Sequence, residues 1–282
     1  PGADNNVIID YDGATATMVT ISASNVTLQG FKIDVTDDAT TAIKCATAVS
    51  DITIQYCTFT ADDGTDRCVF LSTNQVTNLT ISYCQFSGNG DPYWLDIASD
   101  GGCTGDNNFI YNDVNGMECR LGLGTNDIED ITISHNTFSN ADGIWLNEPV
   151  EPTEPVGYFG DIVIQYNTFS GGGDADFAFA VEDSVETDDF EGDTYTTDDL
   201  YLECNDFGGT FVAGAYATVD FPNLTSDLDA QYNWWGDNTG PTHAGNPGGT
   251  GNDVSDNVDY DPWLSVTVTQ PNGGECIKGG RN

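Results

Sequence analysis

Apolar and polar residues alternate in a short phrase that recurs along the chain. The phrase reads ITISHNTFSN at 131–140, with related copies ITIQYCTFTA at 52–61, LTISYCQFSG at 79–88 and IVIQYNTFSG at 162–171. Eight copies begin at Val26, Ile52, Leu79, Asn107, Ile131, Ile162, Leu200 and Leu228. Recurrence every 20 to 50 residues, roughly, is typical of a solenoid, in which each unit buries its apolar face by stacking on its neighbours.

In every copy except the one that begins at Asn107, the first and third positions are apolar, and the second and fourth are mostly Thr, Gln or Ser. This period of two predicts a strand with one buried face and excludes a helical solenoid. A second apolar segment lies between copies, as in TAIKC at 41–45, YWLDI at 93–97 and GIWLN at 143–147. The pattern therefore predicts an all-β parallel β-helix of about eight to nine coils.

The third, sixth and eighth positions of the copies predict columns of side chains about 4.8 Å apart. The sixth position reads Phe31, Cys57, Cys84, Asn112, Asn136, Asn167, Asn205 and Asn233. The Asn side chains are expected to satisfy backbone groups at a turn, and Cys57 and Cys84 are expected to touch, as a strained disulfide or as two thiols. The predicted buried columns comprise Ile54, Ile81, Ile133, Ile164, Phe59, Phe86, Phe138 and Phe169.

This repeat resembles the right-handed parallel β-helix repeat family of the pectate-lyase-like superfamily, whose coils carry an asparagine ladder. The form it resembles occurs in bacterial or archaeal cell-surface, adhesin-like or S-layer-like proteins. The segment 232–264 is similar to the one that ends such helices, where Trp234 and Trp235 would close the core. The resemblance implies a β-helix over 1–264 with this cap, followed at 265–282 by a linker or the start of a β-sandwich module.

The net charge of the chain limits the classes of partner that it can bind. There are 46 acidic and 6 basic residues, a net charge of -40, which argues against nucleic acid and anionic membranes. No apolar run reaches the roughly 20 residues of a membrane helix, so membrane insertion is not expected. The eight Cys form no CxxC pair and only two His are present, which argues against a zinc site.

The fifth position of the copies carries an aromatic series, the tyrosine column. Its members are Tyr56, Tyr83, Tyr111, Tyr166 and Tyr232, with His135 at the same position of another copy. One interpretation is a rail of outward rings that stacks on a polysaccharide or a partner protein. The other is that the rings only cover the turn.

Acidic insertions suggest calcium as a ligand. The insertions at 147–157 and 182–199 follow the second strand of adjacent coils, so they are expected at the same edge. A second acidic series lies beside the cap. The candidate calcium ligands are Asp188, Asp189, Asp193, Asp256 and Asp259. The alternative is an acidic surface suited to high salt, with no discrete metal site.

Three sequons, at Asn25, Asn78 and Asn223, are possible glycosylation sites of an exported chain. Together with the resemblance, they predict an extracellular or cell-surface location.

Catalytic signatures are scarce. A uronate lyase needs a cationic base, and the few Lys and Arg residues are scattered, with Arg120 in ECRLGLG the most prominent. Carboxylates for a glycosidase are plentiful, but the polygalacturonase-like motifs GHG and RIK are absent. We therefore expect no catalytic residues and a structural or adhesive module of a larger surface or filament protein. Its expected partners are modules of the same chain, further copies or polysaccharide, and the alternative is a carbohydrate-active protein.

Overall fold

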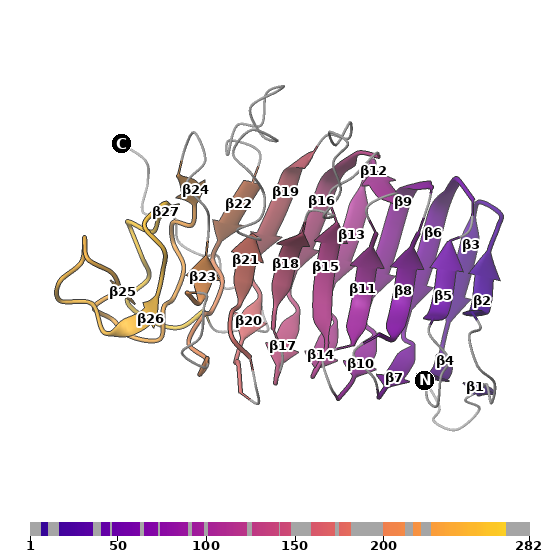
Figure 1. Ribbon diagram of the computed structural model, residues 1–282, viewed down its shortest axis with the longest axis horizontal. Helices are drawn as coiled ribbons and strands as arrows, with labels where there is room; N and C mark the ends of the chain where they lie inside the picture. The colour runs from indigo at the N-terminus through magenta and orange to yellow at the C-terminus, as the bar shows by residue number, and fades with distance from the viewer. Residues whose placement is uncertain are drawn as a thin grey trace.

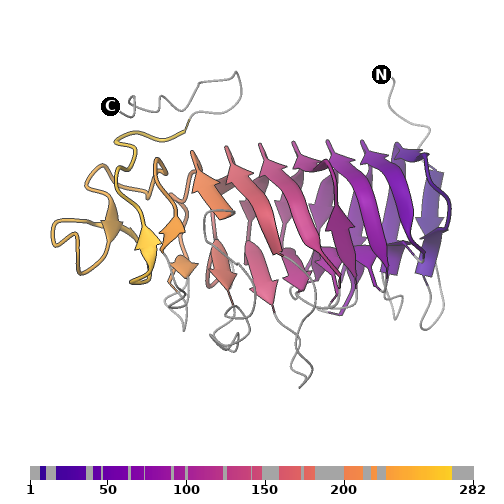
Figure 2. The same ribbon diagram turned by 90° about the horizontal axis from the view of Figure 1, so that it is seen from above.

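The computed structural model describes residues 7–10, 17–35, 41–45, 47–62, 65–72, 74–89, 92–98, 101–122, 126–140, 142–147, 159–172, 175–181, 200–211, 217–220 and 227–268. These residues form the predicted right-handed parallel β-helix, an elongated rod in which three parallel sheets run along the long axis (Figure 1). Seen from above, successive coils stack like rungs from the N-terminal to the C-terminal end (Figure 2).

Each coil contributes one strand, in most cases, to each of three sheets. The seven-stranded sheet contains β1 (Val7–Asp10), β4 (Phe31–Val35), β7 (Thr58–Ala61), β10 (Gln85–Ser87), β14 (Asp113–Asn115), β17 (Thr137–Ser139) and β20 (Thr168–Phe169). The eight-stranded sheet contains β2 (Thr17–Ile21), β5 (Thr41–Cys45), β8 (Arg67–Leu71), β11 (Tyr93–Ile97), β15 (Glu118–Gly122), β18 (Ile144–Asn147), β21 (Phe179–Val181) and β23 (Val219–Asp220).

The third sheet has ten strands and holds the apolar starts of the repeated phrase. Its strands are β3 (Val26–Gln29), β6 (Val49–Gln55), β9 (Gln75–Ser82), β12 (Gly102–Thr104), β13 (Asn107–Ile110), β16 (Ile128–Ser134), β19 (Phe159–Gln165), β22 (Leu200–Glu203), β24 (Leu228–Asp229) and β27 (Val258–Asp259). A two-stranded sheet, β25 (Pro241–Thr242) and β26 (Gly251–Asp253), lies in the C-terminal segment. The pairing of Ile52 with Val26 and Leu79 confirms the predicted alignment of copies.

The predicted core columns are confirmed. All four isoleucines are 0% exposed and the four phenylalanines at most 2% exposed. Phe59 stacks on Phe86 with ring centroids 4.8 Å apart, and Phe138 stacks on Phe169 at 4.7 Å. The spacing of the rings equals the spacing of parallel strands, so each ring rests on the ring of the next coil.

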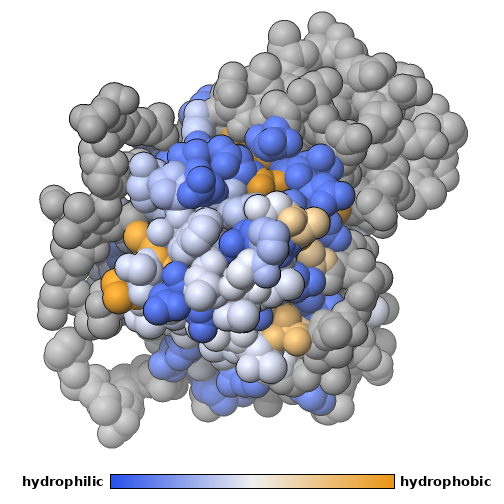
Figure 3. Space-filling model, turned by 90° about the vertical axis from the view of Figure 1, so that its left-hand side faces the viewer, coloured by the Kyte–Doolittle hydropathy of each residue, from blue (hydrophilic) through white to orange (hydrophobic). Residues whose placement is uncertain are grey.

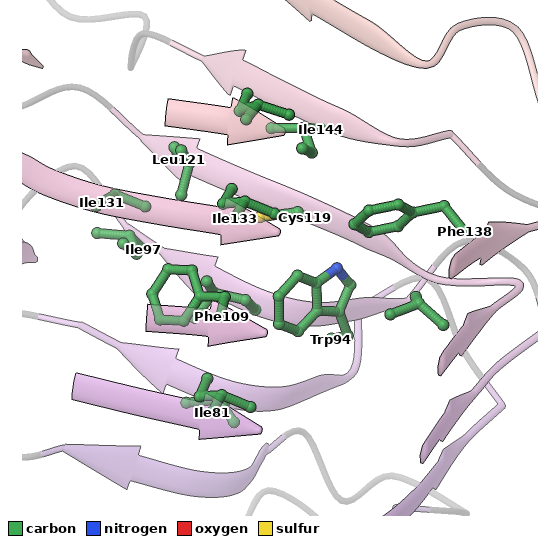
Figure 4. Packing of buried hydrophobic residues seen from close by; sticks show 14 of the residues in the cluster. Ile81, Trp94, Ile97, Phe109, Cys119, Leu121, Ile131, Ile133, Phe138 and Ile144 are labelled. Atoms are coloured by element: carbon green, nitrogen blue, oxygen red, sulfur yellow. The ribbon is translucent and has the colours of Figure 1, made fainter. Parts of the chain in front are cut away.

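One aromatic side chain enters the core from a different sheet. The phenylalanine column is interrupted at Val114, and Trp94 of β11 packs between Phe86 and Phe138, at 5.3 and 6.3 Å (Figure 4). The register of β11 shifts between Tyr93 and Leu95 against β15 but not against β8, so β11 has one residue more than β15 at this point. Trp94 is 0% exposed and faces inward, as does Cys68 at the matching position of β8.

An asparagine ladder joins the coils at the turn after the ten-stranded sheet. The Oδ1 of Asn136 accepts the backbone N–H of Asn112 at 2.8 Å, and its Nδ2 donates to the carbonyl of Phe109 at 2.8 Å. Asn112, Asn167, Asn205 and Asn233 make the same two kinds of bond one coil apart. The ladder therefore satisfies turn groups that the sheets leave unpaired, as predicted.

Cys57 and Cys84 continue this column as neighbouring free thiols. The hydrogen bond with the Cys57 thiol, and then burial, raise the pKa of the Cys84 thiol above its usual range. Of the two states expected from the sequence, the structure thus has packed thiols. Cys204 is disulfide-bonded.

At the C-terminal end Trp235 terminates the aromatic column. It is 0% exposed, and its ring stacks on Phe207 with the ring centroids 5.0 Å apart. Trp234 is half-buried, and its backbone forms an isolated parallel β-bridge with Asp206. The tail 269–282 lies outside the described residues, so the module expected from 265 onward stays a prediction.

Candidate functional site

The tyrosine column stands on a turn with an unusual backbone conformation. Tyr56, Tyr83, Tyr111 and Tyr166 have φ between 53° and 57°, and His135 has φ 59°. Bulky L residues rarely adopt this left-handed region, since the Cβ then approaches the following carbonyl oxygen. The same turn recurs in each coil, so the side chains emerge in one column.

The rings of this column face one another rather than solvent. Tyr83 lies 5.2 Å from Tyr56 and 5.0 Å from Tyr111, with interplanar angles of 10° and 3°. His135 continues the stack at 4.7 Å from Tyr111 and 5.2 Å from Tyr166. Because the ring faces between neighbours are covered, the column presents mainly ring edges and hydroxyls, and binding of a polysaccharide or a partner by these rings stays a prediction.

Tyr232 corrects the expected length of the column. It occupies the same turn, with φ 58°, but only 8% of it is exposed. Its backbone N–H bonds to the carbonyl of Pro262, so the C-terminal segment returns over this coil. Tyr232 is therefore not an outward ring, and the exposed series is Tyr56, Tyr83 and Tyr111, at 54%, 47% and 45%.

A charged and aromatic cluster lies on the outer face of the eight-stranded sheet. We call Arg67, Asp96 and Arg120 the arginine clamp; they belong to the neighbouring strands β8, β11 and β15. Arg120 donates from Nε and one terminal nitrogen to the two oxygens of Asp96, both at 2.8 Å. Arg67 Nε donates to the same carboxylate from the opposite side. Asp96 is 0% exposed, so one buried carboxylate joins three coils.

Aromatic rings complete this cluster. The guanidinium carbon of Arg67 lies 4.8 Å from the Phe70 ring centre, and that of Arg120 lies 4.5 Å from the Tyr93 ring centre. Lys44 Nζ lies 5.6 Å from the Phe70 ring. The ring faces are thus covered by cations of the same protein.

The chemistry of the arginine clamp is that of a fixed ion pair. Burial lowers the pKa of Arg120, but the hydrogen bonds and charge of Asp96 outweigh it, so the net pKa is above its usual value. Such a group cannot take up a proton, which a lyase base must do. Arg120 lies on the outer face of the sheet, and it is bound to a carboxylate rather than free in an acidic field.

The acidic residues beside the cap have partners of the same segment. Asp256 Oδ1 lies 3.0 Å from His243 Nε2, and Asp259 Oδ2 accepts Gln231 Nε2 at 2.8 Å. Among the described residues no three or more His, Cys, Asp or Glu side chains are grouped closely enough to hold a metal ion. Asp188, Asp189 and Asp193 lie outside the described residues.

The sequons occupy different environments. Asn25 is exposed at a left-handed turn with φ 61°. The Asn78 side chain is already engaged, since its Nδ2 donates to Asp51 at 2.9 Å and its Oδ1 accepts from the backbone of Asp106 at 3.1 Å. Asn223 lies outside the described residues. The described part contains no helix with the length and hydropathy to span a membrane.

Asp96 and Arg67 were missed by the sequence analysis. Both stand in the second apolar segment of their coils, but their contact depends on the register between strands 24 to 29 residues apart in the sequence. A usable signal was present, because YWLDI and CRLGL each place a charged residue between two inward apolar positions. Aligning these segments as well as the repeated phrase would have placed Arg120 opposite Asp96, whereas Arg67 lies opposite Tyr93 and could not have been found in this way.

No protein-family model matches the chain, and no curated protein matches it in sequence. Among solved structures, the chain is similar to a double mutant of the tailspike protein of E. coli bacteriophage HK620 in complex with a pentasaccharide. The two share 15% sequence identity with a TM-score of 0.43. The match covers 77% of this chain and 43% of the tailspike chain, so this chain spans less than half of that protein's length.

Proposed function

We propose that this chain is a non-catalytic structural or adhesive module of a larger extracellular, cell-surface protein. The observation that carries the proposal is the arginine clamp. Its two guanidinium groups, which are the strongest cations on the rod, are held by a carboxylate that is 0% exposed. Both groups join coils, and neither of them is free to act as a base.

Other polar and aromatic side chains also connect adjacent coils. The Asn amides bond to backbone groups of adjacent coils, and the Tyr and Phe rings stack between coils. Lys32 pairs with Asp34 of its own strand at 2.9 Å. A chain that commits its polar groups to coil stacking is suited to holding a fixed length, and eight coils at about 4.8 Å extend about 40 Å.

The carbohydrate-active alternative requires more than the fold, because this architecture carries many unrelated functions. A retaining or inverting glycosidase needs two carboxylates facing a shared substrate site. Asp96 is the acid at the centre of the arginine clamp on the eight-stranded sheet. It is buried beneath two arginines and cannot reach a substrate. Polysaccharide, further copies and modules of the same chain stay as proposed partners.

Calcium is proposed as a stabilising ion. The net charge of -40 creates self-repulsion that a divalent cation would reduce. A site that binds calcium only in the folded state raises stability by RT ln(1 + [L]/Kd). Melting temperature measured against calcium, with magnesium as the control, should rise in a saturable manner, and a change that only follows ionic strength would exclude discrete sites.

The test of the proposal is product release from polysaccharides. A panel of neutral and acidic polysaccharides is incubated with the protein, with and without calcium, and reducing ends and unsaturated products are measured. We expect no release above that of heat-denatured protein. Saturable turnover that Arg120→Gln abolishes while the protein remains folded would overturn the non-catalytic assignment.

A further inference from the structure

The C-terminal cap contains a pocket of about 360 Å³, within the range of small-molecule sites, roughly 300–1,000 Å³. We call it the cap pocket; it lies at the end of the rod that Figure 3 faces, where the described surface is mostly hydrophilic. It is lined by Asp227, Gly245, Asn246, Val258, Asp259, Tyr260, Asp261 and Trp263. Two aromatic residues and three aspartates therefore line one small, open pocket.

The two rings are held by the protein itself. The Tyr260 hydroxyl lies 3.2 Å from His243 Nδ1, and the Trp263 indole N–H donates to the Asn238 carbonyl at 3.3 Å. Gly240 lies against the indole, where an added Cβ would come within 2.6 Å of the ring. Both rings are half-buried and pack on the hydrophobic core, so the pocket is preformed.

The charge of the cap pocket is one-sided. Its described lining includes Asp227, Asp259 and Asp261 and no Lys or Arg. The Lys and Arg residues of the described part lie on strands between β4 and β15, away from the C-terminal end of the rod (Figure 1). They are Lys32, Lys44, Arg67 and Arg120. Burial, and then the negative charges of Asp261 and Asp259, raise the pKa of Tyr260. The field at the ring is thus negative, which disfavours anionic ligands.

We infer that the cap pocket binds an alkylammonium group, with Tyr260 and Trp263 facing the alkyl or methyl groups and Asp259 and Asp261 beside the charge. A cation is attracted both to aromatic ring faces and to carboxylates. A neutral sugar could also pack on a ring, but it would leave the three carboxylate charges uncompensated. The inference does not depend on the proposed function of the rod.

Two sources supply this chemistry. One is a quaternary ammonium compound of the choline type, and the other is the side chain of lysine on a protein or peptide. Both present a positive nitrogen on an alkyl chain. The quaternary ammonium carries methyl groups, which favour contact with ring faces, whereas the lysine ammonium carries N–H donors, which favour contact with carboxylates.

Calorimetric titration of the intact chain distinguishes charge from shape. Choline is compared with 3,3-dimethylbutan-1-ol, which has the same shape without the charge, and with N-acetyl-lysine amide and glucose. We expect saturable binding of choline or of the lysine derivative, with the neutral isostere and glucose at least about tenfold weaker, equivalent to about 1.4 kcal/mol. Preference between the two ammonium probes identifies the source.

Matched variants locate the binding. Asp261→Asn removes one charge from the cap pocket and should weaken ammonium binding about three- to tenfold. Asp113→Asn removes the same charge from exposed β14 and should leave it unchanged. Trp263→Leu keeps an apolar side chain but removes the ring, so it should weaken the binding of choline more than that of the lysine derivative. The melting curve of this variant shows whether the cap is still folded.

Three results would overturn the inference. They are equal binding of choline and its neutral isostere, binding of glucose alone, and equal losses in Asp261→Asn and Asp113→Asn. The last would mean that ammonium ions only respond to the charge of the whole molecule.

Discussion

At the scale of single residues, the turn after the ten-stranded sheet determines which side chains the repeat can use. Its left-handed residue is Tyr at five of the coils, although such a conformation costs a bulky residue about 1–2 kcal/mol. Stacked aromatic pairs contribute about 0.5–1.5 kcal/mol each, which offsets that cost in part. Directly after it stands the Asn whose two side-chain bonds connect its coil to the preceding one. Ring and amide thus act together on one turn.

The first prediction concerns the asparagine ladder. Asn136→Ala leaves the N–H of Asn112 and the carbonyl of Phe109 without their partners, and both groups are buried. Each unsatisfied buried group costs about 1–3 kcal/mol, so unfolding by urea should show a loss of about 2–5 kcal/mol. The control is Asn108→Ala, whose side chain makes only an exposed bond of 3.3 Å to the Asp106 carbonyl. Similar losses in the two variants would contradict the role given to the ladder.

At the scale of elements, a side chain of one sheet compensates for a gap in the column of another. Val114 of β14 is smaller than the phenylalanines above and below it, and Trp94 of β11 fills the space between Phe86 and Phe138. The aromatic column is therefore completed from two sheets.

This pairing predicts a rescue. Trp94→Ala should destabilise by about 3–5 kcal/mol because it opens a large cavity. Val114→Phe alone should destabilise by about 1–3 kcal/mol through overpacking, yet in the Trp94→Ala background it should stabilise, since it completes the phenylalanine column. Equilibrium unfolding of the four proteins measures this reversal. If Val114→Phe destabilises in both backgrounds, Trp94 does not fill that gap.

Acidic residues cluster where strands of the ten-stranded sheet begin. Burial, followed by the charges of Asp130, Asp127 and Asp161, raises the pKa of Glu129. A carboxyl whose pKa is higher in the folded state contributes stability that is complete below its ordinary pKa and is lost as pH rises through the raised value.

The third prediction follows from that sign. The stability of the unchanged chain relative to Glu129→Gln should decrease between about pH 4 and about pH 7, because only the unchanged chain must ionise Glu129. Urea unfolding of both proteins across this range measures the difference. Asp113→Asn, at an exposed acid of β14, is the matched control, and an equal pH trend in both variants would contradict the local origin of the effect.

Much of this architecture could be predicted from the sequence, because period-two alternation and a regular repeat fix which residues stack. The buried Ile and Phe columns and the asparagine ladder follow from that rule. The burial of Tyr232 could not be predicted, since it depends on a chain segment that returns over the last coils. The arginine clamp was also missed, because its members meet only when a bulged strand and its neighbours are in register.

At the scale of the whole molecule, the columns make the rod continuous. Each coil contacts mainly its neighbours, so the stability of the solenoid is close to a sum of interface contributions between coils. The arginine clamp spans two such interfaces at the middle of the eight-stranded sheet. On this account its charges exist to hold β8, β11 and β15 together, which is the central claim behind the non-catalytic assignment.

The most direct test is a double-mutant cycle on the arginine clamp, measured by urea unfolding. Arg67→Met and Arg120→Met each leave Asp96 with one partner, so each should cost about 1–2 kcal/mol. The double variant leaves a buried carboxylate unpaired, and its loss should exceed the sum of the single losses by about 1–3 kcal/mol. Additive losses, or a double variant that unfolds at the same urea concentration as the unchanged chain, would contradict the account.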